Sequence, residues 1–156
     1  MEDLNKLLDI AKEAAILAGD FLANNLNSDL KILNNEGRDL KLQIDQDTED
    51  LIKNHIKSRS DLPILAEESG FSEELGESFW VVDPLDGTSN FLRNIPISCV
   101  SIALIHQSIP VLGVINDFNN NHLYFAHQEM QAYMNTVKIS VSDIASKSEG
   151  TLVTGI

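Results

Sequence analysis

Apolar residues recur at intervals of three and four positions along the first part of the chain, from Leu4 to Leu22. This spacing predicts a long helix with one apolar face, ending near residues 24–25. The same spacing returns from Leu51 onward and predicts a second helix that begins near residues 47–48. The stretch 27–39 is polar and contains a Gly-Arg pair, which is typical of a loop.

Beyond Pro63 the pattern changes to short apolar runs and alternation, which predict strands. The strands expected after Pro63 are 64–66, 79–82, 95–105, 111–115, 122–125 and 137–141. One further strand, 40–44, is expected before it. The run of three asparagines at 119–121 predicts the turn of a hairpin. Helices followed by antiparallel strands indicate an α+β or layered α/β fold, in which two helices pack on a largely antiparallel sheet.

Composition and charge narrow the function classes. A chain of 156 residues with 43% hydrophobic and 22% charged residues can form a core, which excludes global disorder. The formal net charge of −13 excludes non-specific binding to a nucleic-acid polymer, which needs clustered Lys and Arg. A small phosphorylated substrate remains compatible with this charge if metal cations lie between the carboxylates and the phosphate.

Other features argue for the cytoplasm and against several chemistries. The single Cys99 cannot form an internal disulfide, and its apolar surroundings predict a buried, unreactive thiol. The N-terminus does not resemble a signal peptide, and no run approaches the roughly 18 apolar residues needed to span a membrane. The four histidines lack metal-ligand spacing, and no P-loop, G-x-G-x-x-G or G-x-S-x-G motif is present.

Candidate chemistry is concentrated in residues 80–91, WVVDPLDGTSNF. Asp83 stands where an apolar strand is expected to end, and Pro84 predicts a turn directly after it. Asp86 follows three residues later, so a tight turn could aim both carboxylates and the Leu85 carbonyl at one point. Such an all-oxygen shell suits Mg²⁺. Asp-Pro and Asp-Gly are also common turn dipeptides, but a turn alone does not require this whole string.

Gly87 and Thr88 complete this motif. A glycine lets the backbone approach a ligand closely, and the N–H groups from Gly87 and Thr88 onward could hold an anion at the start of a helix.

The string resembles the signature of the inositol monophosphatase family of Mg²⁺-dependent, typically lithium-sensitive phosphatases. Glu67-Glu68-Ser69 precedes it as the family's paired glutamates do, and Asp45 with Glu49 resembles the family's acidic stretch at the second helix. Essentially the whole chain, down to residues 152–155, is similar to the N-terminal portion of such an enzyme. The resemblance implies the family's layered α-β sandwich.

The resemblance also implies roles for individual residues. Two or three Mg²⁺ ions would be held by Glu67, Asp83, the Leu85 carbonyl, Asp86 and, for a further and weaker cation, Asp45. Asp86 and the backbone N–H groups of Gly87 and Thr88 would contact the substrate phosphate. The Thr88 hydroxyl, supported by Asp45 and Glu67, would orient or deprotonate a metal-bound water, which would attack phosphorus in line without a phosphoenzyme. The role of Glu68 is left open.

Ser89-Asn90-Phe91 resembles the inositol-monophosphatase type more than bisphosphate nucleotidases. We therefore expect a phosphomonoester of a polyol or a sugar as substrate. Fructose 1,6-bisphosphate, histidinol phosphate and a nucleotide of the 3'-phosphoadenosine type remain alternatives.

The sequence departs from the family pattern in its length and in its later motifs. Family members continue into a second half with a Trp-Asp motif that completes the metal site, whereas the only tryptophan here is Trp80. Residues 126–135 lack the glycines that relatives carry. We therefore expect residues 1–156 to be an N-terminal metal-binding α/β domain, cut after a strand near 150–156, without the C-terminal domain and with impaired activity alone. The alternative is a non-catalytic metal- or partner-binding remnant, and a homodimer is left open.

Overall fold

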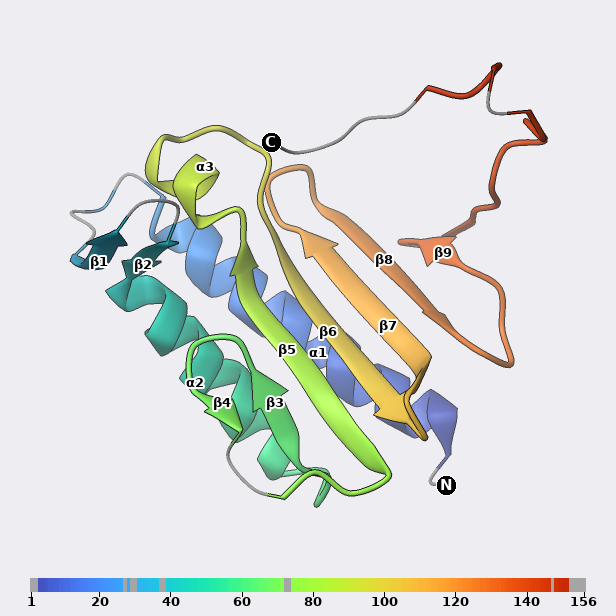
Figure 1. Ribbon diagram of the computed structural model, residues 1–156, viewed down its shortest axis with the longest axis horizontal. Helices are drawn as coiled ribbons and strands as arrows, with labels where there is room; N and C mark the ends of the chain where they lie inside the picture. Colours follow the sequence, from blue (N-terminus) through green and yellow to red (C-terminus); the bar gives the residue numbers. More distant parts are fainter. Residues whose placement is uncertain are drawn as a thin grey trace.

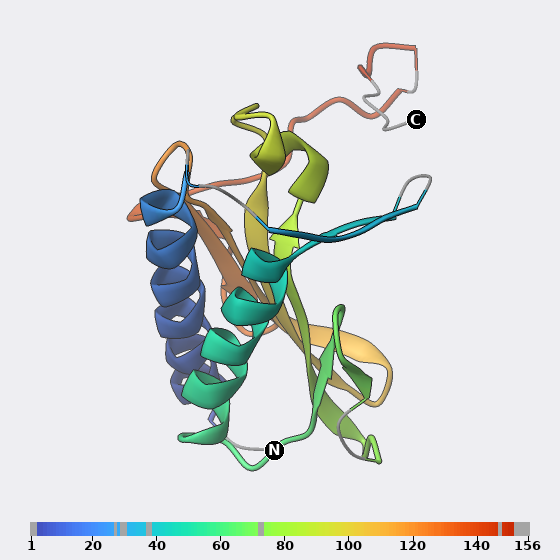
Figure 2. The same ribbon diagram turned by 90° about the vertical axis from the view of Figure 1, so that its left-hand side faces the viewer.

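Two long helices lie side by side on one face of a twisted sheet (Figures 1 and 2). The computed structural model describes residues 3–26, 28, 31–36, 39–71, 74–146 and 148–151, and of residues 34–36, 39–41 and 71 only the backbone. In chain order the elements are α1 (Leu4–Asn24), β1 (Ile32–Glu36), β2 (Asp39–Leu42), α2 (Gln43–Lys57), β3 (Ile64–Ala66), β4 (Gly70–Phe71), β5 (Ser78–Asp86), α3 (Thr88–Leu92), β6 (Cys99–His106), β7 (Ile109–Asp117), β8 (His122–His127), β9 (Tyr133–Met134) and β10 (Val137–Lys138).

Within the described residues, eight strands form the main sheet in the order β10-β9-β8-β7-β6-β5-β3-β4. Every neighbouring pair is antiparallel except β3 and β5, which run parallel. The core lies between the sheet and the two helices, where Trp80, Ile102 and Leu104 are almost fully buried. The predicted α+β layering with a largely antiparallel sheet is confirmed.

Helix α1 spans the predicted residues. The Asp3 carboxylate accepts the Asn5 N–H at 2.9 Å and caps the first turn. Near the other end, Gly19 leaves room for the buried Asn116 of β7, whose Nδ2 donates to the Ala15 carbonyl at 2.8 Å. A Cβ at position 19 would collide with that amide, so the glycine sets how closely the helix approaches the sheet.

Helix α2 begins at Gln43, four residues before the predicted start. The Asp45 carboxylate accepts the Leu42 N–H at 2.7 Å, which satisfies a backbone donor at the helix start. Apolar periodicity does not reveal this first part because Asp45, Thr48 and Glu49 are polar and yet buried. Their burial places carboxylates between the helix and the sheet.

The loop predicted over 27–39 is wrong in part, because residues 32–36 form β1. This strand pairs with β2 in a separate two-stranded ribbon, which projects away from the main sheet (Figure 2). Ile32 and Leu33 are 48% and 37% exposed. Because the described side chains of β1 are exposed rather than packed on the core, its sequence lacks the alternation that normally indicates a strand.

Strand β5 continues past Asp83, where the sequence predicted its end and a tight turn. It runs to Asp86, and its pairing with β6 shifts between Asp83, opposite Ser101, and Asp86, opposite Cys99. Three steps along β5 therefore correspond to two along β6, which is a β-bulge. A bulge accommodates Pro84, which has no N–H for the sheet.

The later strands differ from the predicted ones mainly in where they begin and end. Strand β6 begins at Cys99 rather than at 95, β7 is longer than predicted, and β10 is shorter. The predicted hairpin between β7 and β8 is confirmed. Strand β9 was not predicted, and it pairs with β8. Residues 126–135 contain no glycine, and Asn135, in the turn between β9 and β10, takes the positive φ of 54°. Residues 152–156 of the expected final strand lie outside the described residues.

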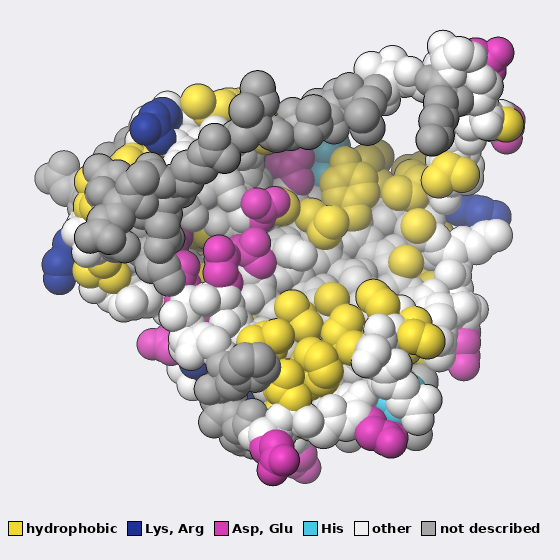
Figure 3. All heavy atoms as spheres, viewed as in Figure 1, with side chains coloured by type: hydrophobic (Ala, Val, Ile, Leu, Met, Phe, Trp, Pro, Cys, Tyr) yellow, Lys and Arg dark blue, Asp and Glu magenta, His cyan; other side chains and the backbone are white. Residues whose placement is uncertain are grey.

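The sheet face opposite the helices carries a layer of apolar side chains (Figure 3). In β5, Trp80 and Val82 are buried toward the helices, so the alternating positions Phe79, Val81 and Asp83 lie on this opposite face, where they are only partly buried. Among the described helices, none has the length and apolarity needed to cross a bilayer.

Candidate metal and phosphate site

Glu67 and Asp83 meet because β3 and β5 are parallel neighbours. Glu67 directly follows β3, and its N–H donates to the Val82 carbonyl at 3.1 Å. This bond places Glu67 beside Asp83, the residue after Val82, close enough for a hydrogen bond between the two carboxyl groups when one of them is protonated. The carboxyl end of a parallel strand pair is a common position for ligand-binding side chains.

The carboxyl group of Asp83 has a strongly altered acidity. Burial, the hydrogen bond and charge of Glu67, and the charge of Asp86 raise its pKa from 3.8 to about 7, although its bond from the Leu85 N–H at 3.1 Å acts in the opposite direction. Like charges this close favour either a shared proton or a bound cation. The site is thus a place where a divalent cation would displace a proton.

This acidity predicts a pH-dependent stability of the metal-free chain. Because the folded-state pKa of Asp83 is raised, its protonated form stabilises the fold fully below about pH 4, and this contribution is lost as the pH rises through 7. A shift from 3.8 to about 7 corresponds to about 4 kcal/mol for a fully buried group; solvent screening of a half-buried carboxyl reduces this to about 1–2 kcal/mol.

Urea unfolding in a chelator between pH 4 and pH 8 measures this loss. The matched variant Asp83→Asn should lack this component of the slope. An unchanged slope in the variant would assign the pH dependence to other groups.

Asp86, Gly87 and Thr88 join β5 to the single turn of α3. The Asp86 side chain is exposed, and its Oδ2 lies 3.8 Å from the Cys99 Sγ that donates to it. Gly87 has φ +89°, and a Cβ there would lie 2.7 Å from the Ile97 carbonyl oxygen. Only glycine takes this conformation without strain in so close a contact.

The start of α3 leaves backbone donors for a ligand. Its first intrahelical bonds run from Asn90 and Phe91 N–H to the Gly87 carbonyl, at 2.8 and 3.0 Å, so the Thr88 N–H precedes them. The Thr88 hydroxyl donates to the Leu85 carbonyl at 3.1 Å. Two of the predicted site groups, the Leu85 carbonyl and the Thr88 hydroxyl, are therefore bonded to each other.

Asp45 and Glu49 both lie on α2 and have different hydrogen-bond partners. The Asp45 carboxylate, 1% exposed, accepts the Leu42 N–H as described above. Glu49, 2% exposed, accepts the Glu68 N–H at 2.8 Å and lies 3.4 Å from the Lys53 Nζ. Glu49 thus anchors the turn that carries the Glu67-Glu68 pair.

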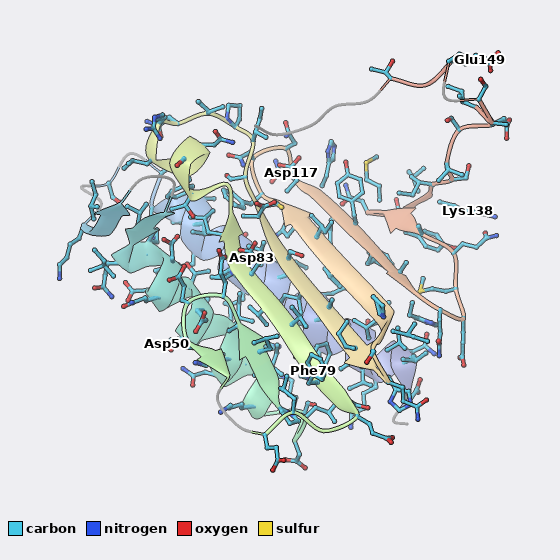
Figure 4. All side chains as sticks on the ribbon, in the orientation of Figure 1. Asp50, Phe79, Asp83, Asp117, Lys138 and Glu149 are labelled. Carbon is cyan, nitrogen blue, oxygen red and sulfur yellow. The ribbon has the colours of Figure 1, made fainter. Side chains whose placement is uncertain are left out.

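A cavity of about 460 Å³ opens beside Asp86 and Gly87. Asp83 and Asp117 both lie toward the end of the sheet that carries α3 (Figure 4). Cys99 and Asp117 line the cavity and were not predicted as part of the site. Asp117 stands at the end of apolar β7 as Asp83 follows the apolar part of β5, and that common position was the available signal.

Cys99 is half-buried rather than fully buried. Burial, together with the charges of Asp86, Asp83 and Asp117, raises the pKa of its thiol to about 12. A thiol at that pKa carries almost no thiolate at neutral pH, which supports the prediction of an unreactive thiol.

The donor chemistry of this site fits a hard divalent cation. Glu67, Asp83, the Leu85 carbonyl and Asp86 offer only oxygen, which Mg²⁺ prefers. In the described parts of the chain, no three His, Cys, Asp or Glu side chains converge to metal-ligand distances, so the carboxylates would have to close around an ion. Which ions bind, and through which of these residues, stays a prediction.

Comparison with known proteins identifies the family of this chain. The sequence model of the inositol monophosphatase family matches residues 3–156. The chain belongs to the inositol monophosphatase family. An inositol-1-monophosphatase of Synechocystis is 40% identical over 157 aligned positions, which cover 98% of this chain and 54% of that protein.

Other members of the family also match this chain. A protein of Aquifex aeolicus named fructose-1,6-bisphosphatase/inositol-1-monophosphatase is 33% identical over 99% of this chain and 60% of its own length. The crystal structure of the suppressor protein SuhB from Bartonella henselae matches with a TM-score of 0.82 and 34% identity, over 88% of this chain and 55% of that one. The inositol monophosphatase fold is thus confirmed, and the chain spans about half the length of the curated relatives it matches.

Proposed function

We propose that this chain binds Mg²⁺ and takes part in the hydrolysis of a small phosphomonoester, of the inositol monophosphate or sugar phosphate kind. The observation that carries the proposal is the position of Glu67 beside Asp83, set by the bond from the Glu67 N–H to the Val82 carbonyl, together with Asp86, which lines the cavity and is close enough to raise the Asp83 pKa. Carboxylates gathered in this way need a cation or a proton. A phosphate bridged by that cation could approach an acidic chain.

In this proposal the chain's own groups have distinct tasks. Glu67, Asp83, Asp86 and the Leu85 carbonyl would hold the principal ions, and Asp45 would contribute to a further one, for two or three Mg²⁺ in all. The N–H groups of Gly87 and Thr88 bind phosphate oxygens, and the Thr88 hydroxyl, with Glu67 and Asp45, orients the attacking water. When bound, Mg²⁺ would lower the pKa of that water and would neutralise charge on the phosphoryl group.

The substrate class follows from the family at a coarse level only. Relatives are named as inositol monophosphatases, and the Aquifex protein is named for fructose 1,6-bisphosphate as well. We propose a polyol or sugar phosphate for this chain, with residues 1–156 acting as the N-terminal, metal-binding part of the enzyme.

A second candidate is a non-catalytic metal- or partner-binding protein. Two observations favour it: the apolar sheet face opposite the helices, which no described element covers, and the absence of three converging ligands among the described residues. Such a face could bind a partner or a second copy of the chain. It predicts stabilisation by Mg²⁺ without phosphate release.

One set of measurements on the 156-residue chain separates the two candidates. Thermal unfolding with Mg²⁺ or a chelator tests ion binding, and we expect Mg²⁺ to raise the melting temperature. Phosphate release from inositol 1-phosphate and fructose 1,6-bisphosphate, with Mg²⁺ and with Mg²⁺ plus Li⁺, tests catalysis. We expect slow, Li⁺-sensitive release. Release that needs no Mg²⁺ would contradict the proposal, and stabilisation with no release at all would favour the second candidate.

A further inference from the structure

The cavity beside Asp86 has an unusual lining for a site that accepts phosphate esters. Its described lining combines apolar residues with the side chains of Asp86, Asn90, Ser98, Asp117, Asn120 and Tyr124. Two of these are carboxylates, several carry neutral polar groups, and none of the residues named is Lys, Arg or His. A group that enters this cavity therefore meets negative charge and neutral hydrogen-bonding partners.

Asp117 is held in place at the end of β7. Its Oδ1 accepts the Asn120 N–H at 3.2 Å, and its Oδ2 accepts the Asn120 Nδ2 at 2.8 Å. The same loop is tied to the opposite wall, because the Asn119 Nδ2 donates to the Ser98 carbonyl at 3.0 Å and to its Oγ at 3.1 Å. The Asp117 carboxylate is thus a positioned part of the cavity wall.

We propose that Asp117 determines specificity, by keeping a second phosphate group out of this cavity and by favouring a neutral polyhydroxyl group there. The proposal rests on the proposed function, in which the phosphate to be cleaved is bound at Asp86, Gly87 and Thr88. The rest of the substrate then faces the cavity. Hydroxyl groups can donate hydrogen bonds to the Asp117 carboxylate, whereas a fully ionised second phosphate can only accept them.

The size of this discrimination follows from electrostatics. A phosphate monoester carries a charge of −1.5 to −2 near pH 7. At separations of several ångströms and an effective dielectric constant close to that of water, repulsion by one carboxylate weakens binding of the additional phosphate by roughly tenfold. This repulsion is screened by salt, unlike a purely steric effect.

Two ligands that differ by one phosphate test the proposal. Calorimetry in Mg²⁺ gives dissociation constants for fructose 1-phosphate and fructose 1,6-bisphosphate on the 156-residue chain. We expect Asp117→Asn to shift the ratio of the two constants about tenfold toward the bisphosphate. Glu129→Gln removes the same charge at an exposed position outside the cavity, and it should leave the ratio unchanged. Raising the salt concentration should reduce the difference between the parent and Asp117→Asn.

A second pair of variants tests the charge without altering the Asp117 loop. Ile115 lines the same cavity and is 45% exposed. Ile115→Glu should bind the bisphosphate more weakly than Ile115→Gln, with little difference for the monophosphate.

Equal ratios in the parent, in Asp117→Asn and in both Ile115 variants would overturn the inference and leave the proposed function intact. A parent chain that binds neither ligand in Mg²⁺ would overturn both.

Discussion

Replacing Asp83 by asparagine should lower the affinity for Mg²⁺ by about 10- to 100-fold or more and abolish Mg²⁺-dependent phosphate release. The size of this loss is taken from the effects of perturbing residues that support metal ligands. The substitution removes the carboxylate that hydrogen-bonds Glu67 and lies within electrostatic reach of Asp86. It also removes the group whose charged form is disfavoured in the metal-free fold. The same variant should therefore be as stable as the parent chain, or more stable, above pH 7 in a chelator.

This opposite effect on binding and on stability makes the test sharp. Urea unfolding with and without Mg²⁺ measures both quantities in one series. Asp61→Asn, at an exposed position in the connection before β3, is the charge-matched control and should change neither. Undiminished Mg²⁺ stabilisation in Asp83→Asn would remove Asp83 from the metal site.

Replacing Gly87 by alanine should destabilise the fold by about 2–4 kcal/mol and weaken phosphate binding. The residue has φ +89°, which costs an L-residue roughly 1–2 kcal/mol. The added Cβ would also lie 2.7 Å from the Ile97 carbonyl oxygen and 3.2 Å from the Ser98 Cα, both backbone atoms that cannot rotate away. Relief of this contact would move α3 or the segment before β6, and both border the cavity.

Two other glycines separate the cost of the backbone conformation from the cost of the steric contact. Gly70 has φ +67° with open space where a methyl group would be added, so Gly70→Ala should show the conformational cost alone, about 1 kcal/mol. Gly113 has open space and no positive φ, so Gly113→Ala should be nearly neutral. Equal losses of unfolding free energy at positions 70 and 87 would show that the contact with Ile97 is unimportant.

The sequence predicted those parts of the fold in which a regular surface is buried on one side. The apolar face of α1 and the hairpin of β7 and β8 are examples, because burial imposes a period on the chain. It failed at β1, whose described side chains Ile32 and Leu33 are exposed, and at the start of α2, where the polar residues Asp45, Thr48 and Glu49 are buried. It also missed the bulge after Asp83, since Pro84 is compatible with either a turn or an irregular strand.

For the site, the amino-acid sequence by itself determined the chemistry. An apolar strand, two aspartates three positions apart, and Gly-Thr directly after them indicated the candidate residues and the family, because the motif is contiguous. Tertiary structure alone decided which carboxylates meet. The parallel pairing of β3 with β5 brings Glu67 to Asp83, and the ends of β6 and β7 bring Cys99 and Asp117 to the cavity. Which carboxylates gather at one point depends on how the strands pair, and the local sequence does not specify that pairing.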